Sequence, residues 1–402
     1  MQIYKVALLG DKDHGKSTAI GNLLMLTKSV SGARIEEAKR ISKELGRPFE
    51  PGFILDSFSE EREGAMTIDT TRAQMRYRGA GFEFIDVPGH EELITNMLTG
   101  ASSAGTAVLI VSAKKGEGVS DQTRRHLLLA RMLGIVSVVV AVNKMDTTGY
   151  SKDAFEMVRG SLNALIANAG NTVGSIEATF VPISAYNGDN LIKRSKNMKW
   201  YNGKPLAALL VEFAAKAGAR KKGGLRAVVQ GSIEGGGTAC RIISGSIKRG
   251  NEVLALPSGA RLNVERVVSA GRSVPSAGAG SAPVLKLGGG SASRGSVLCT
   301  SGDRPLVGKS AGALLFLVKR PKAPTIKLGT QESRCRIRIE RAVDITSGAF
   351  CNEKTVKPLG IYSATMDFAA TLAYERFEKL TELGRFTLHE NGRLVGVGII
   401  EQ

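Results

Sequence analysis

The chain has few aromatic residues and no long apolar run. Aromatic side chains make up 5% of its 402 residues, which argues against a platform for stacking bases, so we expect any RNA contact to be made mainly to phosphates. The longest apolar runs, TAVLIVSA (106–113) and IVSVVVAV (135–142), are too short to cross a bilayer and predict buried parallel strands. The sequence therefore predicts no membrane span.

Cysteine is also scarce, and its spacing excludes two kinds of site. The four cysteines lie far apart in the sequence, with no C-x-x-C pair and no neighbouring histidine. Neither a zinc knuckle nor a disulfide framework is therefore indicated, and we expect small core residues instead. These cysteines are Cys240, Cys299, Cys335 and Cys351.

The N-terminus lacks the features of a secretory signal. Met1 is followed almost at once by the strand-like stretch YKVALLG, without a long apolar region and a small-residue cleavage site behind it. We therefore expect a cytoplasmic protein.

Negative charge is depleted in only one half of the chain. Residues 1–189 carry 21 Lys and Arg against 22 Asp and Glu, whereas residues 190–402 carry 34 against 15. The net charge of +18 thus comes from the C-terminal half. A basic surface attracts nucleic acid, anionic substrates or acidic partners, or simply keeps a protein soluble.

The pattern of apolar residues changes along the chain. Up to about residue 215, short β-branched runs alternate with amphipathic helical stretches, which predicts a mostly parallel sheet with helices on both faces and a ligand site at the strand C-terminal ends. Beyond it, short alternating strands separated by glycine turns predict antiparallel β-barrels. We expect an α/β P-loop domain (1–215), a basic linker (216–224) and two barrels (225–304 and 305–402).

A glycine-rich motif lies between the first predicted strand and a predicted helix. Gly10, Gly15, Lys16 and Ser17 follow the spacing G-x-x-x-x-G-K-S. In a P-loop the backbone amides turn toward the phosphates, the lysine reaches the β- and γ-phosphates, and the hydroxyl binds Mg²⁺. The predicted phosphate-binding residues of this loop are Gly10, Asp11, Lys12, Asp13, His14, Gly15, Lys16, Ser17 and Thr18.

Two further motifs follow the glycine-rich loop along the sequence. In DVPGH, Asp86 is placed to hold Mg²⁺ through its water, and the Gly89 amide to contact a γ-phosphate. In NKMD, the Asp146 carboxylate can accept hydrogen bonds from guanine N1 and N2, which adenine does not offer together, so the sequence predicts GTP and GDP. The predicted guanine-binding residues are Asn143, Lys144, Asp146, Ser184, Ala185 and Tyr186.

These motifs, GDKDHGKST, MTID, DVPGHEELITNMLTGAS, AVNKMD and SAYNGDN, resemble those of the translation-factor GTPases over the whole length of the chain. The resemblance implies that Thr67 binds Mg²⁺ and the γ-phosphate, and that His90 positions the attacking water. A positioned water suits the largely dissociative phosphoryl transfer. The alternative for His90 is a histidine that only packs or caps the turn.

The chain departs from the family pattern around the attacking water. The family usually has an apolar residue at the position of Lys12 and a β-branched one at the position of Met66, where they screen the water from the histidine. We therefore expect the access of His90 to the water to differ from that in the family. Lys12 either contacts a phosphate or is a solvated loop charge.

Within the family the sequence resembles two relatives. Stretches such as SKNMKWYNGKPL resemble the GTPase subunit of sulfate adenylyltransferase, whereas DHGKST and LGRFTLHENGRLVGVGII resemble elongation factor 1-alpha. The first resemblance implies an adenylyltransferase partner subunit, and the second implies aminoacyl-tRNA and the ribosome, with RNA bound by the basic C-terminal half. We expect the sulfate-activating role first, the translation role as its alternative, and a GTP-binding scaffold with little hydrolysis as a third.

Overall fold

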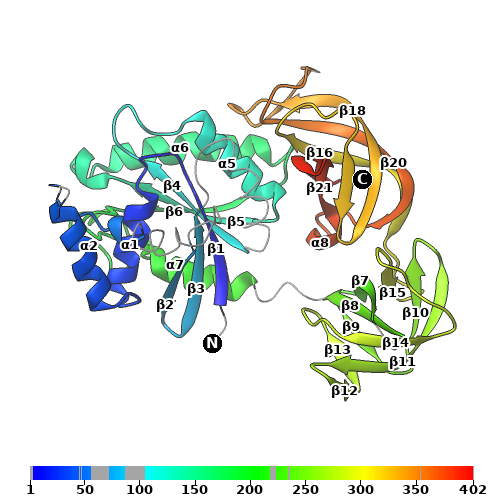
Figure 1. Cartoon of the computed structure of the whole chain (residues 1–402). Coiled ribbons are helices and arrows are strands. Elements are labelled where there is room, and N and C mark those ends of the chain that lie inside the picture. The colour runs from blue at the N-terminus through cyan, green and yellow to red at the C-terminus, as the bar shows by residue number, and fades with distance from the viewer. Residues whose placement is uncertain are drawn as a thin grey trace. The chain divides into compact units, whose positions relative to one another are not determined.

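Figure 1 shows a computed structural model of the chain. It describes residues 3–44, 46, 48–55, 72–86, 105–217, 223–233, 236–353 and 355–401. The chain divides into two compact units, one formed by residues 1–217 with 344–349 and the other by residues 218–343 with 350–402.

The first unit is an α/β domain built on a six-stranded sheet of order β2-β3-β1-β4-β5-β6. All neighbouring strands are parallel except β2 and β3. Its described elements are β1 (Ile3–Leu9), α1 (Lys16–Leu26), α2 (Gly32–Glu44), β2 (Arg72–Tyr77), β3 (Ala80–Asp86), β4 (Thr106–Ser112), α5 (Asp121–Met132), β5 (Ser137–Asn143), the 3-10 helix η2 (Met145–Thr148), α6 (Lys152–Ala169), β6 (Glu177–Pro182) and α7 (Leu206–Ala217).

The central strands are covered on both faces. Every residue of β4 is buried, as the uninterrupted apolar run predicts. Val6 and Leu8 of β1 share a core with α1 and α7, and the alternate residues Ala7 and Leu9 are buried as well. Because successive side chains point to opposite faces, helices must cover both sides, and α5 contacts β1 and β4.

Serine residues begin two of the helices. The Ser120 side chain accepts a hydrogen bond from the Thr123 amide at the start of α5, and Ser151 accepts one from Ala154 at the start of α6. Each bond satisfies one amide that lacks a partner within its helix. The two caps therefore fix the first residues of α5 and α6.

The second unit contains two antiparallel barrels of six strands each. In the first, the order β10-β15-β7-β8-β14-β11 closes by pairing of β10 with β11. In the second, the order β17-β21-β22-β16-β20-β18 closes by pairing of β17 with β18.

The first barrel and the strands attached to it comprise β7 (Arg226–Ile233), β8 (Gly237–Ser244), β9 (Ser246–Lys248), β10 (Glu252–Leu256), β11 (Ala260–Ser269), β12 (Arg272–Val274), β13 (Ser276–Gly278), β14 (Val284–Gly288) and β15 (Val297–Cys299). The second comprises β16 (Leu306–Leu317), β17 (Thr325–Leu328), β18 (Gln331–Val343), β19 (Phe350–Cys351), β20 (Gly360–Tyr374), α8 (Thr381–Gly384), β21 (Arg385–Glu390) and β22 (Arg393–Ile400).

The fold class predicted from the sequence is confirmed, since a mostly parallel α/β sheet is followed by two antiparallel barrels. The helix α7 continues through Ala217 and so includes the first two residues of the predicted linker, 216–224. Three cysteines are buried and Cys351 is half-buried, all as free thiols. No helix in the described ranges is both long and apolar enough to span a membrane.

Candidate functional site

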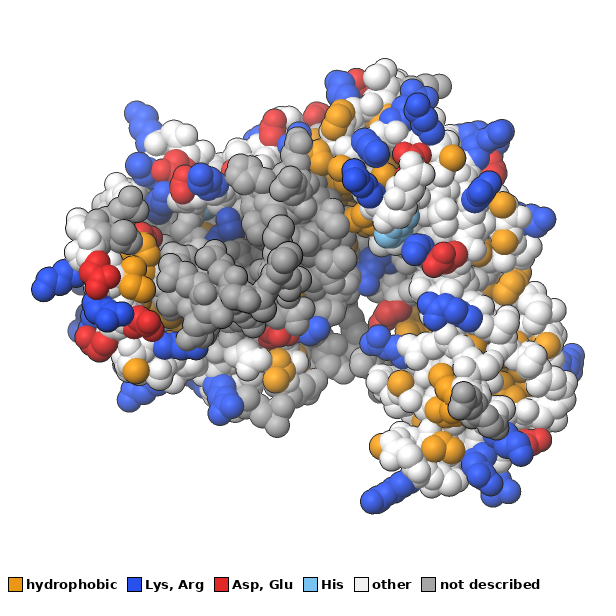
Figure 2. Space-filling model, in the orientation of Figure 1, with side chains coloured by type: hydrophobic (Ala, Val, Ile, Leu, Met, Phe, Trp, Pro, Cys, Tyr) orange, Lys and Arg blue, Asp and Glu red, His pale blue; other side chains and the backbone are white. Residues whose placement is uncertain are grey.

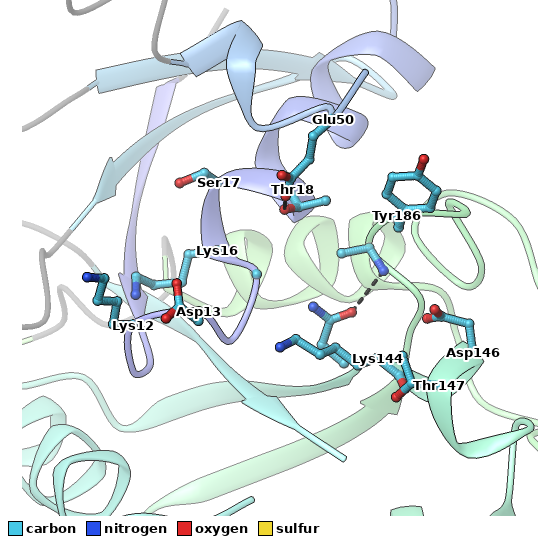
Figure 3. Close-up of a pocket in the computed structure, with 13 residues that line it drawn as sticks. Lys12, Asp13, Lys16, Ser17, Thr18, Glu50, Lys144, Asp146, Thr147 and Tyr186 are labelled. Carbon is cyan, nitrogen blue, oxygen red and sulfur yellow. Dashed lines mark hydrogen bonds between the residues drawn. The ribbon is translucent and has the colours of Figure 1, made fainter. Parts of the chain in front are cut away.

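A cavity of about 610 Å³ opens at the carboxyl ends of the parallel strands in the first unit. This is the edge at which α/β sheets bind ligands, and the volume lies in the range of small-molecule sites. Its walls are the loops after β1, β5 and β6 together with the first turn of α1 and Glu50 (Figure 3). The lining residues are Lys12, Asp13, Gly15, Lys16, Ser17, Thr18, Glu50, Asn143, Lys144, Asp146, Thr147, Ala185 and Tyr186.

Two glycines of the loop after β1 are required by close packing. A side chain at Gly10 would place its Cβ 2.3 Å from the Ile110 carbonyl oxygen, and one at Gly15 would place it 2.4 Å from Asn143 Nδ2. Both residues also have positive φ, 138° and 90°, which favours glycine. The loop can therefore turn tightly into α1 only with these residues.

Positive charge gathers at the end of the cavity beside this loop. Lys16 Nζ donates hydrogen bonds to the carbonyls of Gly10 and Asp11, at 2.9 and 2.8 Å, so its ammonium lies against the loop. Lys12 is exposed, and its ammonium makes no recorded hydrogen bond or ion pair within the part of the chain that the structure describes. Together with the amide groups that begin α1, these side chains suit an anion such as a polyphosphate.

Asn143 joins three loops behind the cavity. Its Nδ2 donates to the His14 carbonyl at 2.8 Å, and its Oδ1 accepts from the Ala185 amide at 2.8 Å. Asn22 of α1 reinforces the last loop by donating to the carbonyls of Ala185 and Tyr186. The phosphate-side loop and the opposite end of the cavity are thus held at a fixed separation.

The other end of the cavity presents the Asp146 carboxylate, the Ala185 backbone and Tyr186 (Figure 3). Lys144 lies between the two ends, and its ammonium pairs with Glu117 Oε2 at 2.7 Å. Burial alone would raise the pKa of Glu117, but hydrogen bonds from Lys144, Ser112 and Lys114 offset it and lower the pKa to about 2. The ion pair fixes the Lys144 stem along the cavity wall.

Two histidines lie behind the phosphate-side loop. His126 Nδ1 of α5 accepts from the Gly10 amide at 3.3 Å, and burial lowers the pKa of His126 to about 4. His14 Nδ1 lies 3.3 Å from the Ile110 carbonyl, and burial lowers its pKa too. Asp11 accepts a hydrogen bond from Ser120, the residue that caps α5. These contacts hold the loop from the side away from the cavity.

The structure brings most of the predicted residues together, but not all. Gly10, Asp11 and His14 contribute to the loop without lining the cavity, and Ser184 is fully buried behind it. Glu50 and Thr147 line the cavity and were not predicted. Thr147 directly follows NKMD, which is a signal that could have found it, whereas nothing in the sequence around Glu50 marks it.

Several predicted residues cannot be placed. Met66, Thr67, Gly89 and His90 lie outside the described residues. Asp86 ends β3 beside Leu8 of β1, at the edge that carries the cavity, but its side chain is also outside the described part. Of the predicted Mg²⁺ ligands, Ser17 is therefore the one whose side chain is described, and it lines the cavity next to Lys16 (Figure 3). Its hydroxyl is a hard oxygen donor of the kind that Mg²⁺ accepts.

Comparison with known proteins agrees with this geometry. Residues 1–217 match the family model described as the elongation factor Tu GTP binding domain, and residues 317–401 match the GTP-eEF1A C-terminal domain-like family. The chain is 35% identical to elongation factor 1-alpha of Aeropyrum pernix, with 98% of this chain and 95% of that protein covered. It is 33% identical to elongation factor 1-alpha of Thermoplasma volcanium, with 97% and 95% covered.

A solved structure of sup35 complexed with GDP aligns with 100% of the chain and 94% of its own length. Its identity of 23% and TM-score of 0.44 add nothing to the assignment. The family is shown by the match over more than half the chain and by the full-length relatives. GTPases of this family bind GTP and GDP with Mg²⁺. The chain therefore belongs to the translation-factor GTPases, resembles elongation factor 1-alpha over nearly its whole length, and is a GTP-hydrolysing enzyme.

Proposed function

We propose that the chain carries aminoacyl-tRNA to the ribosome in its GTP-bound state, in the cytoplasm. The observation that carries this proposal is the full-length likeness to proteins named elongation factor 1-alpha. The sulfate-activating role, which we expected first from the sequence, is not supported by the names of these relatives. An adenylyltransferase partner is therefore not part of the proposal.

A row of arginines on the second barrel supports a nucleic-acid partner. Arg334, Arg336 and Arg338 alternate with less exposed residues along β18, so all three point outward at intervals of about 6–7 Å. Arg338 pairs with Asp367 at 3.3 Å, while no ion pair is recorded for the other two in the described ranges. Figure 2 shows Lys and Arg side chains outnumbering acidic ones over this barrel.

In the proposed GTP complex the phosphates lie at the Lys16 end of the cavity and the base at the Asp146 end. The amides of residues 13–18 and the Lys16 ammonium bind the phosphate oxygens, and Asp146 accepts from guanine N1 and N2. Ser17, with Thr67 and Asp86, would hold Mg²⁺. When bound, that ion neutralises charge on the β- and γ-phosphates.

For hydrolysis we propose that His90 orients the attacking water, with the Gly89 amide and Thr67 sensing the γ-phosphate. A His90→Ala variant should bind GTP with unchanged affinity and lose most of the ribosome-stimulated hydrolysis. Single-turnover hydrolysis and GTP binding are measured on the same preparation. If the variant hydrolyses GTP at the normal stimulated rate, His90 has no role in the mechanism. The proposal for the nucleotide-binding site would still stand.

The tRNA proposal is tested by measuring aminoacyl-tRNA capture by the GTP and GDP forms of the full chain across a salt series. We expect tight capture by the GTP form alone, weak capture of uncharged tRNA, and a steep loss of affinity with salt. Equal capture of aminoacyl-tRNA by the GTP and GDP forms would indicate only non-specific binding to a basic surface. Co-purification with an adenylyltransferase, together with no aminoacyl-tRNA binding, would reinstate the sulfate-activating role.

Charge-reversal variants then locate the RNA surface. The double variant Arg334→Glu and Arg336→Glu should weaken capture and reduce the salt slope by about 2, because two phosphate contacts are removed. Arg76→Glu is the matched control, since Arg76 is an exposed arginine on β2 of the first unit. The control reverses one charge and the double variant reverses two, so a control effect half as large as that of the double variant would mean that only total charge matters.

A further inference from the structure

Glu50 is one of three acidic residues that line the cavity, together with Asp13 at the phosphate end and Asp146 at the base end (Figure 3). It lines the wall between the phosphate end, where Lys16 and Ser17 lie, and the base end, where Asp146 and Tyr186 lie (Figure 3). A carboxylate repels phosphate oxygens, so phosphate binding does not explain it. The group that connects phosphates to base in a nucleotide is the ribose, and its hydroxyls are hydrogen-bond donors.

The position of Glu50 is fixed by packing against α1. Thr18 Oγ1 donates to Glu50 Oε1 at 2.6 Å. A Cβ at Gly21 would lie 1.9 Å from the Pro51 carbonyl oxygen, and one at Gly52 would lie 3.4 Å from Ser17 Cβ. The segment that carries Glu50 is therefore pressed directly against the first turns of α1, in a contact that Gly21 permits.

The second carboxylate oxygen of Glu50 has no hydrogen-bond partner among the described residues. Within the described part of the chain, only Thr18 is recorded as bonding to the Glu50 carboxylate, and it uses Oε1. A carboxylate with a free oxygen can accept from one or both hydroxyls of a ribose, the interaction by which dinucleotide-binding proteins hold a ribose. The bond to Thr18 orients the carboxylate for this contact.

We infer that Glu50 binds the ribose of the guanine nucleotide and makes the site selective for ribonucleotides over their deoxy counterparts. This inference rests on the proposed orientation of the nucleotide, with phosphates at Lys16 and base at Asp146. Glu50 is the specificity residue, and Thr18 positions it. A deoxynucleotide that lacks the contacting hydroxyl loses this hydrogen bond, and the Glu50 carboxylate then keeps only its bond from Thr18.

The test is calorimetric titration of the full chain, with Mg²⁺, using GDP, 2′-deoxy-GDP and 3′-deoxy-GDP. Ribose-linked fluorophores are avoided because they would occupy the group under test. We expect at least one deoxynucleotide to bind about tenfold or more weakly than GDP, since a hydrogen bond to a charged group is lost. Equal affinities for all three nucleotides would overturn the inference.

Variants assign the discrimination to Glu50. In Glu50→Ala the ratio of deoxy-GDP to GDP affinity should approach one, while Glu50→Gln, which keeps an acceptor oxygen, should retain part of it. The ratio is insensitive to the change in net charge, because the nucleotides compared carry the same charge. Glu44→Ala, an exposed acid on α2 that does not line the cavity, should keep the wild-type ratio. Wild-type discrimination that survives in both Glu50 variants would assign it to another residue and refute the inference.

A further titration separates this inference from the one on which it rests. ADP should bind far more weakly than GDP, because Asp146 reads the base. If ADP binds as tightly as GDP, the proposed placement of the nucleotide is wrong. The proposed role of Glu50 is then also refuted, because it depends on that placement. If ADP binds weakly but the deoxynucleotides bind as tightly as GDP, only the inference about Glu50 is refuted.

Discussion

Replacing Asn143 by alanine should uncouple the two ends of the nucleotide site. The side chain is 2% exposed and makes two hydrogen bonds of 2.8 Å, one to the His14 carbonyl and one from the Ala185 amide. A buried polar group left without a partner costs about 1–3 kcal/mol, so the two orphaned groups together are worth about 2–6 kcal/mol. Since 1.4 kcal/mol is a factor of about ten, GDP affinity should fall by roughly 30-fold or more if the loops must be re-ordered by the ligand.

The cost divides between folding and binding, so both are measured. Calorimetric titration gives the GDP affinity, and denaturant unfolding of the nucleotide-free chain gives its stability. The loss of binding free energy and the loss of folding free energy should add to about 2–6 kcal/mol. Asn187→Ala is the control, because Asn187 is an exposed asparagine whose side chain donates only to Tyr150 Oη, at 3.2 Å, in the described part. A combined loss for Asn143→Ala no greater than that of the control would refute the account of how the loops are held.

Three other substitutions test separate parts of the structure. Lys12→Met should weaken the binding of GTP several-fold more than the binding of GDP, because an exposed ammonium at the phosphate end acts most on the extra charge of the γ-phosphate. Equal changes in the two dissociation constants would show that Lys12 is only a solvated loop charge. His126, whose pKa burial lowers to about 4, takes up a proton on unfolding, so stability should fall as pH drops from about 6.5 to 4. In His126→Gln, the free energy of unfolding should depend less steeply on pH in this range, and the remaining dependence is due to His14. An unchanged dependence would show that His126 is not the group that takes up the proton. Arg226→Met should destabilise the second unit by about 3–5 kcal/mol, because Arg226 and Glu375 are both buried and paired. Adding Glu375→Gln to Arg226→Met should recover much of the lost stability. If Arg226→Met alone is as stable as the wild type in denaturant unfolding, the pair of Arg226 and Glu375 does not stabilise the unit.

The sequence predicts the fold well where one pattern determines one element. Uninterrupted β-branched runs identify β4 and β5, and the glycine spacing places the turn into α1. The antiparallel β2 is a different case, because its direction depends on its pairing with β3 and not on a pattern of its own.

The site is less predictable where long-range packing decides which atoms face the ligand. Ser184 belongs to a guanine-binding motif in the sequence, yet it is buried while Ala185 and Tyr186 line the cavity. Glu50 reaches the cavity only because Pro51 and Gly52 pack onto Gly21 and Ser17, a contact that no local pattern encodes. Residues placed by their own loop can thus be predicted, whereas those placed by a neighbouring segment cannot.

The claim that this cavity holds a guanine nucleotide, with its base at Asp146, is tested most directly by the variant Asp146→Asn. An amide at this position can accept one hydrogen bond and donate to the 2-oxygen of xanthine, whereas it no longer accepts both donors of guanine. The account predicts that GDP affinity falls at least 100-fold, from the loss of about 3 kcal/mol, while XDP becomes the preferred ligand. If Asp146→Asn instead binds GDP as tightly as the wild type and gains no affinity for XDP, the placement of the nucleotide in this cavity is contradicted.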